Sequence, residues 1–386
     1  MVRGRLLMSM SVIQVIGNVA VGGAERHVRD LAVGLRARGV HVEVVCPRPG
    51  PLVEQLRSDG LPVRCLELAF PRPGDEYGLD FAVVEHLERY FRERQPDVVH
   101  SHLYPAHLHA SLAAARARVP GVVQTAHTLI VRPGDVLLGR LTNVHTIATS
   151  RAVSRLLTSV GVPREQIEVV YNGVGEAHFE TDSKLVRVAR RMLDLGDGPV
   201  LGVVSRLSSE KGIDVLLRAT RRLVCRIQDL TVLVAGDGPQ EADLRRLAHE
   251  LDLDGVVRFL GARTDVPALN RLFDVFVLPS REEACPIALL EAMAASCAVV
   301  ATQVGGSAEL ITPGVNGLLV PADDPEALAE AIQQLIRDPT RRSAMAQAAR
   351  YRAANRFTLS RMVERTLNMY QRLAGSAAAT PTPLAS

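Results

Sequence analysis

The chain has 386 residues, a length that predicts two domains of ordinary size. Hydrophobic residues make up 47% and charged residues 23%, which excludes a wholly disordered chain and a collagen-like one. The 45 basic and 42 acidic residues leave a net charge of only +3, so a strongly basic nucleic-acid-binding protein is excluded too. We therefore expect a globular protein without nucleic acid among its partners.

The five cysteines are odd in number and widely spaced, and no CxxC pair occurs. This pattern favours a reducing cytoplasm, with neither a disulfide framework nor a zinc knuckle. No run of about 18 apolar residues could span a membrane. Arg3 and Arg5 precede the apolar segment 6–16, an arrangement similar to a signal peptide, but Gln14 interrupts the segment and no clear cleavage site follows. A buried first strand is the favoured interpretation.

Short β-branched runs alternate with amphipathic segments in the first half of the chain. This alternation predicts βαβ units and a parallel sheet covered on both faces. We expect strands at 10–16, 41–46, 97–101, 121–126, 144–149 and 167–170. We expect helices near 23–37, 78–94, 105–118 and 151–160.

The same alternation restarts after residue 178, with a linker inside 172–197. Strands are expected at 199–205, 230–235, 256–260, 275–279 and 298–302, and helices at 211–227, 239–251, 286–295, 325–337 and about 340–373. The fold class is therefore α/β, with two Rossmann-like, doubly wound parallel-sheet domains. The predicted divisions are a first domain over 1–178, a second over 179–360, a helix over 361–374 that could pack back on the first domain, and a disordered tail over 375–386.

A glycine-containing loop follows the first expected strand. The segment that begins at Gly17 does not match the GxGxxG motif of dinucleotide-binding folds, because no glycine stands two residues further on. It does not match a P-loop either, because no Lys-Ser/Thr pair follows Gly22 and Gly23. NAD enzymes and ordinary ATPases are thus disfavoured. Paired glycines let a ligand approach the amides of a helix start, and a tight turn that needs positive φ is the alternative.

Two cations follow the first strand of the second domain. Only two of the 45 basic residues are lysines, Lys184 and Lys211, and Lys211 lies in segment 205–212 together with Arg206. A guanidinium can bind two oxygens at once, an ammonium acts as a point charge, and a helix N-terminus also favours an anion. These residues could offset the charge of a diphosphate, and a solvated helix start is the alternative.

Seven residues separate Glu283 from Glu291. Pro286 is typical of a first helical turn, so we expect Glu283 in the loop and Glu291 inside the helix. Eight helical steps turn by about 800°, so the carboxylates need not share a face and could contact different parts of one elongated ligand. A pair of surface glutamates is the alternative. The free amides at this helix start, which would face a phosphate or sugar oxygen, belong to Ala284, Cys285 and Ile287.

Six of the eleven histidines lie between residues 100 and 145. His100, His102 and His127 end expected strands, where ligands of such sheets bind. No HExxH motif or Asp-rich partner accompanies them, so we expect no metal site. Hydrogen bonding in a cleft and a role in the core are the two interpretations left open.

These segments together resemble the family-4 glycosyltransferases, retaining enzymes of the GT-B fold, over about residues 10–370. Each motif is modest alone, but their order and spacing are specific. The motifs are GGAE (22–25), DVVHSH (97–102), TAH (125–127), YNGV (171–174), RLSSEKG (206–212), GDGP (236–239), PSREEACPIALLEAMA (279–294), GGSAEL (305–310) and NGLLVP (316–321).

The resemblance implies two domains that face a central cleft, with a nucleotide-sugar donor on the second and an acceptor on the first. Arg206 and Lys211 match the residues that hold the donor pyrophosphate. Glu283 matches a glutamate that contacts sugar hydroxyls, and Glu291 matches one that binds the ribose. On this basis we expect catalysis to depend on Arg206, Lys211, Glu283 and His127.

Further roles follow from the same resemblance. His127 matches a cleft histidine near the transferred sugar, and His102 is expected on the acceptor side. Gly22 and Gly23 match the loop that closes over the phosphates, whereas Arg263 lies in the 261–265 loop expected near the base. The chain departs from the family at Ser205, usually Gly, and at Ala284 and Cys285, usually Gly and an aromatic residue.

The expected reaction is retaining hexosyl transfer, from a UDP-sugar on base rates, to a glycan, lipid-linked or small-molecule acceptor. No metal or other cofactor is expected, because Arg206, Lys211 and helix N-termini could stabilise the leaving diphosphate. The first domain's loops offer no obvious carboxylate nucleophile, which favours a front-face route. An epimerase or sugar-phosphate synthase of the same fold is the alternative, and a non-catalytic nucleotide-sugar-binding subunit is a third hypothesis.

Contact with an anionic membrane is a further possibility, because many members of this family extend lipid-linked glycans at the inner face of the cell membrane. The basic residues that could face lipid are Arg26, Arg29, Arg36, Arg38, Arg116 and Arg118. A solvated helix face is the alternative.

Overall fold

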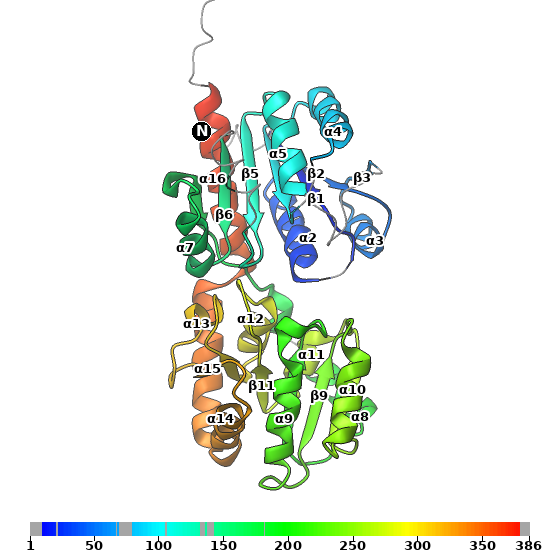
Figure 1. The fold of residues 1–386 in the computed structure, drawn as a ribbon, viewed down its shortest axis with the longest axis vertical. Helices are drawn as coiled ribbons and strands as arrows, with labels where there is room; N and C mark the ends of the chain where they lie inside the picture. The colour runs from blue at the N-terminus through cyan, green and yellow to red at the C-terminus, as the bar shows by residue number, and fades with distance from the viewer. Residues whose placement is uncertain are drawn as a thin grey trace, which may run out of the picture. The chain divides into compact units, whose positions relative to one another are not determined.

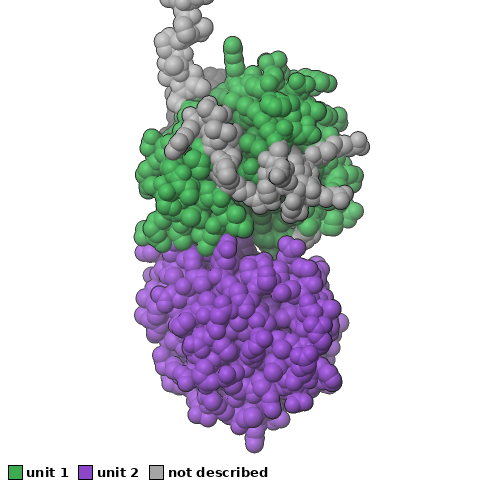
Figure 2. Space-filling model, viewed as in Figure 1, with its two compact units in different colours: residues 1–171, 359–386 green, residues 172–358 purple. Residues whose placement is uncertain are grey.

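The computed structural model describes residues 10–20, 22–66, 68, 79–104, 106–131, 136, 143–180 and 182–378. The chain divides into two compact units, one formed by residues 1–171 and 359–386 and the other by residues 172–358 (Figure 2). The predicted boundary after residue 178 therefore lies inside the second unit, and the last helix begins before the predicted residue 361. Of the signal-like segment 6–16, residues 6–9 lie outside the described residues, whereas residues 11–16 form a buried strand, as the favoured interpretation expected.

Seven parallel strands form the sheet of the first unit among the described residues, in the order β3-β2-β1-β4-β5-β6-β7. The long apolar runs of the sequence account for the central strands, which are buried on both faces. The strands are β1 (Ser11–Ile16), β2 (His41–Cys46), β3 (Val63–Cys65), β4 (Val98–His102), β5 (Gly121–Ala126), β6 (Val144–Ala148) and β7 (Ile167–Val169).

Helices cover both faces of this sheet, giving three layers (Figure 1). One core lies between the sheet and α2, α3 and α16, and the other lies between the sheet and α4 and α5. The helices of this unit are α2 (Gly23–Arg36), α3 (Pro51–Ser58), α4 (Phe81–Arg94), α5 (Ala106–Arg116), α7 (Arg151–Ser159) and α16 (Leu359–Ala378). The expected first residues of α4 and α5, 78 and 105, lie outside the described residues.

The second unit contains six parallel strands within the described residues, in the order β10-β9-β8-β11-β12-β13. The strands are β8 (Val200–Val204), β9 (Thr231–Ala235), β10 (Val257–Gly261), β11 (Val275–Leu278), β12 (Ala298–Thr302) and β13 (Leu318–Val320). The helices are α8 (Ser183–Met192), α9 (Ile213–Leu223), α10 (Glu241–Glu250), α11 (Val266–Asn270), α12 (Ile287–Ala294), α13 (Ser307–Leu310), α14 (Pro325–Arg337) and α15 (Pro339–Arg356). One apolar core joins the sheet to α9, α10 and α14.

The helical stretch expected over 340–373 is two helices. α15 ends at Arg356, and α16 begins at Leu359 and belongs to the first unit. α16 continues to Ala378, so the tail predicted from residue 375 is wrong for its first four residues, and residues 379–386 lie outside the described part. Apolar residues of α16 join the core against α2, with Val363 touching the position where a Cβ on Gly34 would stand.

Both strand orders reverse direction beside a central strand, at β1/β4 in the first unit and β8/β11 in the second. In doubly wound sheets, ligands bind beyond the carboxyl ends of the strands at this point. The glycine-containing loop follows β1, and the segments with Arg206 and Glu283 follow β8 and β11. Strand order alone therefore places the two motifs of the second unit on adjacent loops.

Tyr370 anchors α16 to the sheet through one buried hydrogen bond. Its hydroxyl lies 2.5 Å from Nδ1 of His100, and neither side chain is exposed. The Tyr370→Phe substitution leaves this imidazole nitrogen buried without a partner, so we expect the free energy of unfolding to fall by about 1–3 kcal/mol. Urea unfolding monitored by circular dichroism measures the change. Tyr351→Phe, at an exposed position on α15, is the matched control and should change stability little; equal losses in both variants would contradict the assignment.

Candidate functional site

Two adjacent loops of the second unit bring the predicted Lys211 and Glu283 together. Nζ of Lys211 lies 2.9 Å from Oε1 of Glu283, which is buried and also accepts a hydrogen bond from Ser280 Oγ at 2.8 Å. Among the described residues, none donates to Oε2 of Glu283. This oxygen is therefore free to accept a hydrogen bond from a ligand hydroxyl.

Arg206 lies on the same loop as Lys211, and its side chain is exposed. The guanidinium makes no hydrogen bond or ion pair with the part of the chain that the structure describes, whereas the backbone carbonyl of Arg206 accepts from the Ser208 amide. Glu210 lies between the two cations in the sequence. Burial opposes the ionisation of its carboxyl group, but the pKa is nevertheless lowered, because Ser208 Oγ donates a hydrogen bond to the carboxylate and because Lys211 and Arg206 place positive charge nearby. The loop thus presents one cation paired to Glu283 and one cation open to an anion.

The second glutamate lies inside the helix, as predicted, and has a different partner. α12 begins at Ile287 with Pro286 as its N-cap, and Glu291 lies buried one turn further on. His178 Nε2 lies 3.3 Å from Oε1 of Glu291. Sequence reasoning missed His178, because no motif singled it out.

The start of α12 leaves backbone amides available to a ligand. Within the described residues, the amides of Ala284, Cys285 and Ile287 donate to no backbone acceptor. Asn172, from the YNGV motif, donates to the carbonyl of Cys285 at 2.8 Å and so fixes this loop. Burial raises the pKa of the Cys285 thiol to about 12, so this cysteine is a small apolar group and not a nucleophile.

Arg263 is tied to its neighbour in the sequence. Its Nε and Nη2 donate to the two carboxylate oxygens of Asp265 at 2.9 and 2.8 Å. Arg263 lies in the loop after β10, and β9 separates β10 from β8 in the sheet. The expected role near the base stays a prediction.

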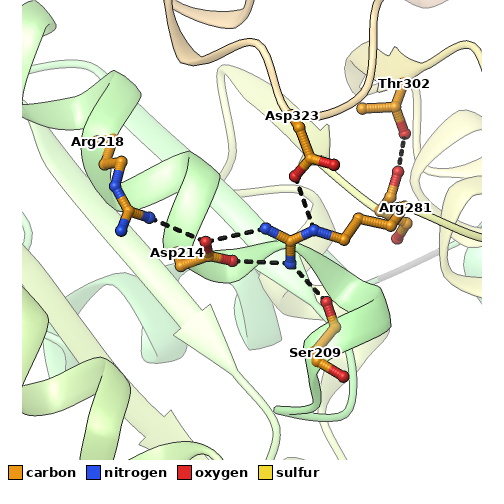
Figure 3. A network of polar contacts seen from close by, with 7 residues as sticks. Ser209, Asp214, Arg218, Arg281, Thr302 and Asp323 are labelled. Atoms are coloured by element: carbon orange, nitrogen blue, oxygen red, sulfur yellow. Dashed lines mark hydrogen bonds and ion pairs between the residues drawn. The ribbon is translucent and has the colours of Figure 1, made fainter.

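Arg281 is the residue of this unit that sequence reasoning overlooked although it lies inside a quoted motif, PSREE. Its guanidinium binds both oxygens of Asp214, one oxygen of Asp323 and the carbonyl of Ser209 (Figure 3). An arginine between a strand and a helix carries no spacing signal, so only the folded structure reveals these contacts.

In the first unit, Gly22 is the N-cap of α2 and Gly23 its first residue. Neither has positive φ, so the tight-turn interpretation is wrong. A Cβ on Gly22 would lie 2.7 Å from Glu25 Oε2, whereas a Cβ on Gly23 would meet open space. Asn18 donates to the buried Glu25 at 2.8 Å and closes the loop. Glu25 is thus a carboxylate at this loop that sequence reasoning did not single out.

His102 and His127 lie together at the carboxyl ends of β4 and β5. His102 Nδ1 is 3.2 Å from His127 Nε2, and His102 is fully buried. Burial lowers the pKa of both imidazoles well below the usual value, and the neighbouring histidines lower it further. Both are therefore neutral at pH 7, and each can donate or accept a hydrogen bond.

His100 belongs to the core and not to a cleft, because its nitrogens are bound by Tyr370 and by Thr125 Oγ1, the latter at 2.7 Å. His27 on α2, missed by sequence reasoning, joins His102 and His127, with ligand atoms of all three within 4.8 Å of one another. Three imidazoles form a donor set that zinc accepts. The expectation that the protein holds no metal therefore has a specific place where it can be tested.

For four of the six arginines that could face a membrane, the structure gives side-chain partners inside the first unit. Arg29 binds Asp59 through two bonds of 2.5 and 2.9 Å, Arg36 donates to the Asp59 carbonyl, and Arg38 donates to Ser360. Arg116 binds Glu88 at 2.6 Å. These contacts favour the solvated helix face. No helix in the described residues is long and apolar enough to span a membrane.

Two family profiles cover most of the chain, "Glycosyltransferase Family 4" over residues 21–177 and "Glycosyl transferases group 1" over residues 189–352. D-inositol 3-phosphate glycosyltransferase of Saccharomonospora viridis is 31% identical over 397 residues, covering 92% of this chain and 90% of that protein. The chain belongs to the family-4 glycosyltransferases. The protein of the same name from Salinispora tropica is 34% identical over 308 residues, covering 71% of this glycosyltransferase and 63% of the relative.

Three further comparisons concern the donor and the fold. GDP-mannose-dependent alpha-(1-6)-phosphatidylinositol monomannoside mannosyltransferase of Mycolicibacterium smegmatis is 32% identical over 223 residues, 55% of this chain and 58% of that protein. A crystal structure of Anabaena Alr3699/HepE in complex with UDP-glucose is 25% identical with a TM-score of 0.82, covering 96% of this glycosyltransferase and all of that chain. A glycosyltransferase from Rickettsia africae, 22% identical, has the same fold with a TM-score of 0.82 over 94% of this chain and 98% of that one. The expected GT-B fold and family are confirmed.

The buried histidines predict a pH dependence of stability. Burial lowers the pKa of His107 to about 4, whereas an unfolded histidine titrates near 6.5. Between pH 6.5 and pH 4, His107 is protonated in the unfolded chain but stays neutral in the folded chain. The free energy of unfolding therefore falls as the pH drops toward 4. In His107→Gln this fall should be shallower than in the parent protein, by up to about 1.4 kcal/mol per pH unit. Urea unfolding at pH 5, 6 and 7 measures both slopes, and identical slopes would show that His107 takes up its proton in the folded state.

Proposed function

We propose that this glycosyltransferase moves a hexose from a UDP-sugar to an acceptor hydroxyl, with retention of configuration at the anomeric carbon. The observation that carries the proposal is the arrangement of the β8 and β11 loops. Lys211 contacts Glu283 there, Arg206 is open to an anion, and three amides at the start of α12 are free among the described residues. These groups suit a ligand with a diphosphate joined to a polyhydroxylated sugar.

The donor's base and sugar are inferred from relatives. The HepE complex with UDP-glucose supports a UDP-sugar, and the name of the mycobacterial relative makes a GDP-sugar the competing donor. Ala284 and Cys285 replace larger or more flexible groups of the family beside Glu283, and both are buried. This change alters the shape of the sugar pocket without adding a charge.

The acceptor is a carbohydrate, a lipid-linked glycan or a small polyol. The relatives named for D-inositol 3-phosphate support a small phosphorylated polyol as the first candidate to assay. His102 and His127 are the acceptor-side groups, since both are neutral and His127 is partly exposed. A neutral imidazole can accept a hydrogen bond from an acceptor hydroxyl and orient it.

The bond changes follow a front-face route. The anomeric carbon's bond to the diphosphate breaks, the acceptor oxygen bonds to the same face, and the acceptor proton passes to the departing diphosphate oxygen. Arg206, Lys211 and the α12 amides stabilise the negative charge that develops on this leaving group. Retention is checked by the anomeric coupling constant of the product in proton NMR.

Removal of either cation tests the donor site. A thermal-shift screen against nucleoside diphosphates and their sugars first identifies the donor. Arg206→Ala and Lys211→Ala should each lower turnover at least tenfold, because a lost charge-assisted hydrogen bond costs about 1.5–3 kcal/mol. Lys184→Ala removes the chain's other lysine, which lies on α8, and is the matched control. Unchanged turnover in either loop variant would refute the site, and conversion of the donor sugar without acceptor would indicate an epimerase.

Transfer is also expected to continue without a metal ion. The residues assigned to the leaving group are cations and amides, so exhaustive EDTA treatment should leave the rate of UDP release with acceptor unchanged. The contrary outcome has two parts: EDTA abolishes the rate and zinc restores it, and zinc fails to restore it in His27→Gln. That result would assign a catalytic metal to the cluster of His27, His102 and His127. Metal analysis of the purified protein accompanies the assay.

A further inference from the structure

Arg281 lies in the loop after β11 and connects three separate segments of the second unit. Its Nη1 and Nη2 donate to the two carboxylate oxygens of Asp214 at 3.0 and 2.9 Å, at the start of α9. Its Nε donates to Asp323 at 2.7 Å, in the turn before α14. Figure 3 shows the guanidinium between these two carboxylates, with Ser209 on the same side as Asp214.

The same residue holds the backbone of the loop that carries the two cations. Nη1 of Arg281 donates to the carbonyl of Ser209 at 2.5 Å, and its backbone amide donates to the carbonyl of Glu210 at 2.8 Å. Ser209 and Glu210 directly precede Lys211 in the 3-10 turn η3 (Ser209–Lys211), whose N-cap has no side-chain hydrogen bond. Within the turn, the amide of Lys211 donates to the Ser208 carbonyl at 2.9 Å and that of Gly212 to the Ser209 carbonyl at 3.4 Å. Arg281 adds two bonds to the turn from a separate loop.

Gly212 ties the other end of this turn to the Arg281 loop. It has φ of +64°, and a Cβ there would lie 2.1 Å from the carbonyl oxygen of Pro279. Residues 209–212 are thus held against residues 279–281 by backbone contact at one end and by Arg281 at the other. The backbone contact and Arg281 together fix the position of the Lys211 backbone. The position of the backbone in turn determines whether Nζ of Lys211 can reach Glu283.

A contribution to overall stability alone does not explain this arrangement. The Arg281 side chain is about one-third exposed and that of Asp323 more than half exposed, and ion pairs at such positions contribute little to the free energy of unfolding. A planar guanidinium that satisfies four acceptors restricts the geometry of its partners more than a lysine could. Its main effect is therefore on the order of the loop.

We propose that Arg281 is a positioning residue for the donor diphosphate: it holds the 205–212 loop in the conformation in which Arg206 and Lys211 receive the phosphates. This inference rests on the proposed function, because it assigns a diphosphate to that loop. Arg281 itself need not touch the donor. Without Arg281, the 205–212 loop must become ordered when the donor binds. The entropy lost in that ordering weakens the affinity for the phosphates.

Calorimetric titration of Arg281→Ala with matched nucleotides tests the proposal. The probes are UDP with UMP and GDP with GMP, using the pair that the parent protein binds. We expect the dissociation constant of the diphosphate to rise about tenfold, a free-energy change of about 1.4 kcal/mol. The monophosphate, which has fewer contacts with this loop, should lose much less. In the transfer assay, the KM for the donor should rise while the KM for the acceptor stays constant.

Arg218→Ala is the matched control. Arg218 binds the same Asp214 at 2.9 Å, but among the described residues its side chain contacts nothing in segment 205–212. It should therefore bind the diphosphate as the parent protein does. If Arg281→Ala is unfolded at the assay temperature, Asp323→Ala takes its place: Asp323 is exposed and contacts Arg281 through Nε, so its loss should weaken diphosphate binding in the same direction by a smaller factor.

The outcomes separate the two proposals. Unchanged diphosphate affinity in the folded Arg281 variant, or an equal loss for diphosphate and monophosphate, would overturn the positioning role while the proposed function stands. Equal weakening in Arg218→Ala would overturn it too, because the effect would then arise from Asp214. A parent protein that binds neither UDP nor GDP would instead refute the proposed function.

Discussion

Contact between backbones at the carboxyl edge of the second sheet is the constraint on which the donor site depends. The loops after β8, β11 and β12 lie so close that no side chain fits between them. A Cβ on Gly212 would lie 2.1 Å from the Pro279 carbonyl oxygen, and one on Gly306 would lie 1.9 Å from that of Ala284. These glycines explain why the RLSSEKG and GGSAEL motifs contain glycine where they do. Because the loops touch, a cation on one loop and a carboxylate on the next can meet without long, mobile side chains.

Electrostatics then decides what the touching loops can bind. Lys211 and Glu283 neutralise each other, and Ser280 orients the carboxylate through the same oxygen that the ammonium contacts. The uncompensated positive groups are Arg206 and the helix amides. In the proposed reaction, the diphosphate leaving group supplies the negative charge that these groups lack, most strongly when the glycosidic bond is partly broken. Groups placed in advance for that charge lower the barrier without reorganisation.

Much of the fold was predictable because it depends on periodicity and propensity. The apolar runs at 121–126 and 298–302 are strands with the expected bounds, as buried parallel strands require. Four short elements, β3, β13, α11 and α13, were missed, since three to five residues carry no measurable period. Two longer helices were missed as well: α3 was not predicted, and α8 lies inside the segment predicted to hold the linker, 172–197. The motifs placed Lys211 and Glu283 on strand-to-helix loops of the second domain and assigned both to the donor, but the contact between them was not predicted, nor were those of Arg281 and His178. All three contacts, counting that of Arg281 with Asp214, join segments more than 60 residues apart that only tertiary packing brings together.

The first unit depends on the last helix of the chain in the same way. α16 reaches its sheet after the whole second unit has been traversed, and Tyr370 then satisfies His100, the imidazole next to His102. His102 in turn holds His127 through a hydrogen bond of 3.2 Å. Tyr370 thus supports the imidazoles at the ends of β4 and β5 indirectly, through His100. Among the described residues, it makes no hydrogen bond to His102 or His127. The imidazoles that the proposed function assigns to the acceptor are therefore supported by a helix that follows the whole second unit in the sequence.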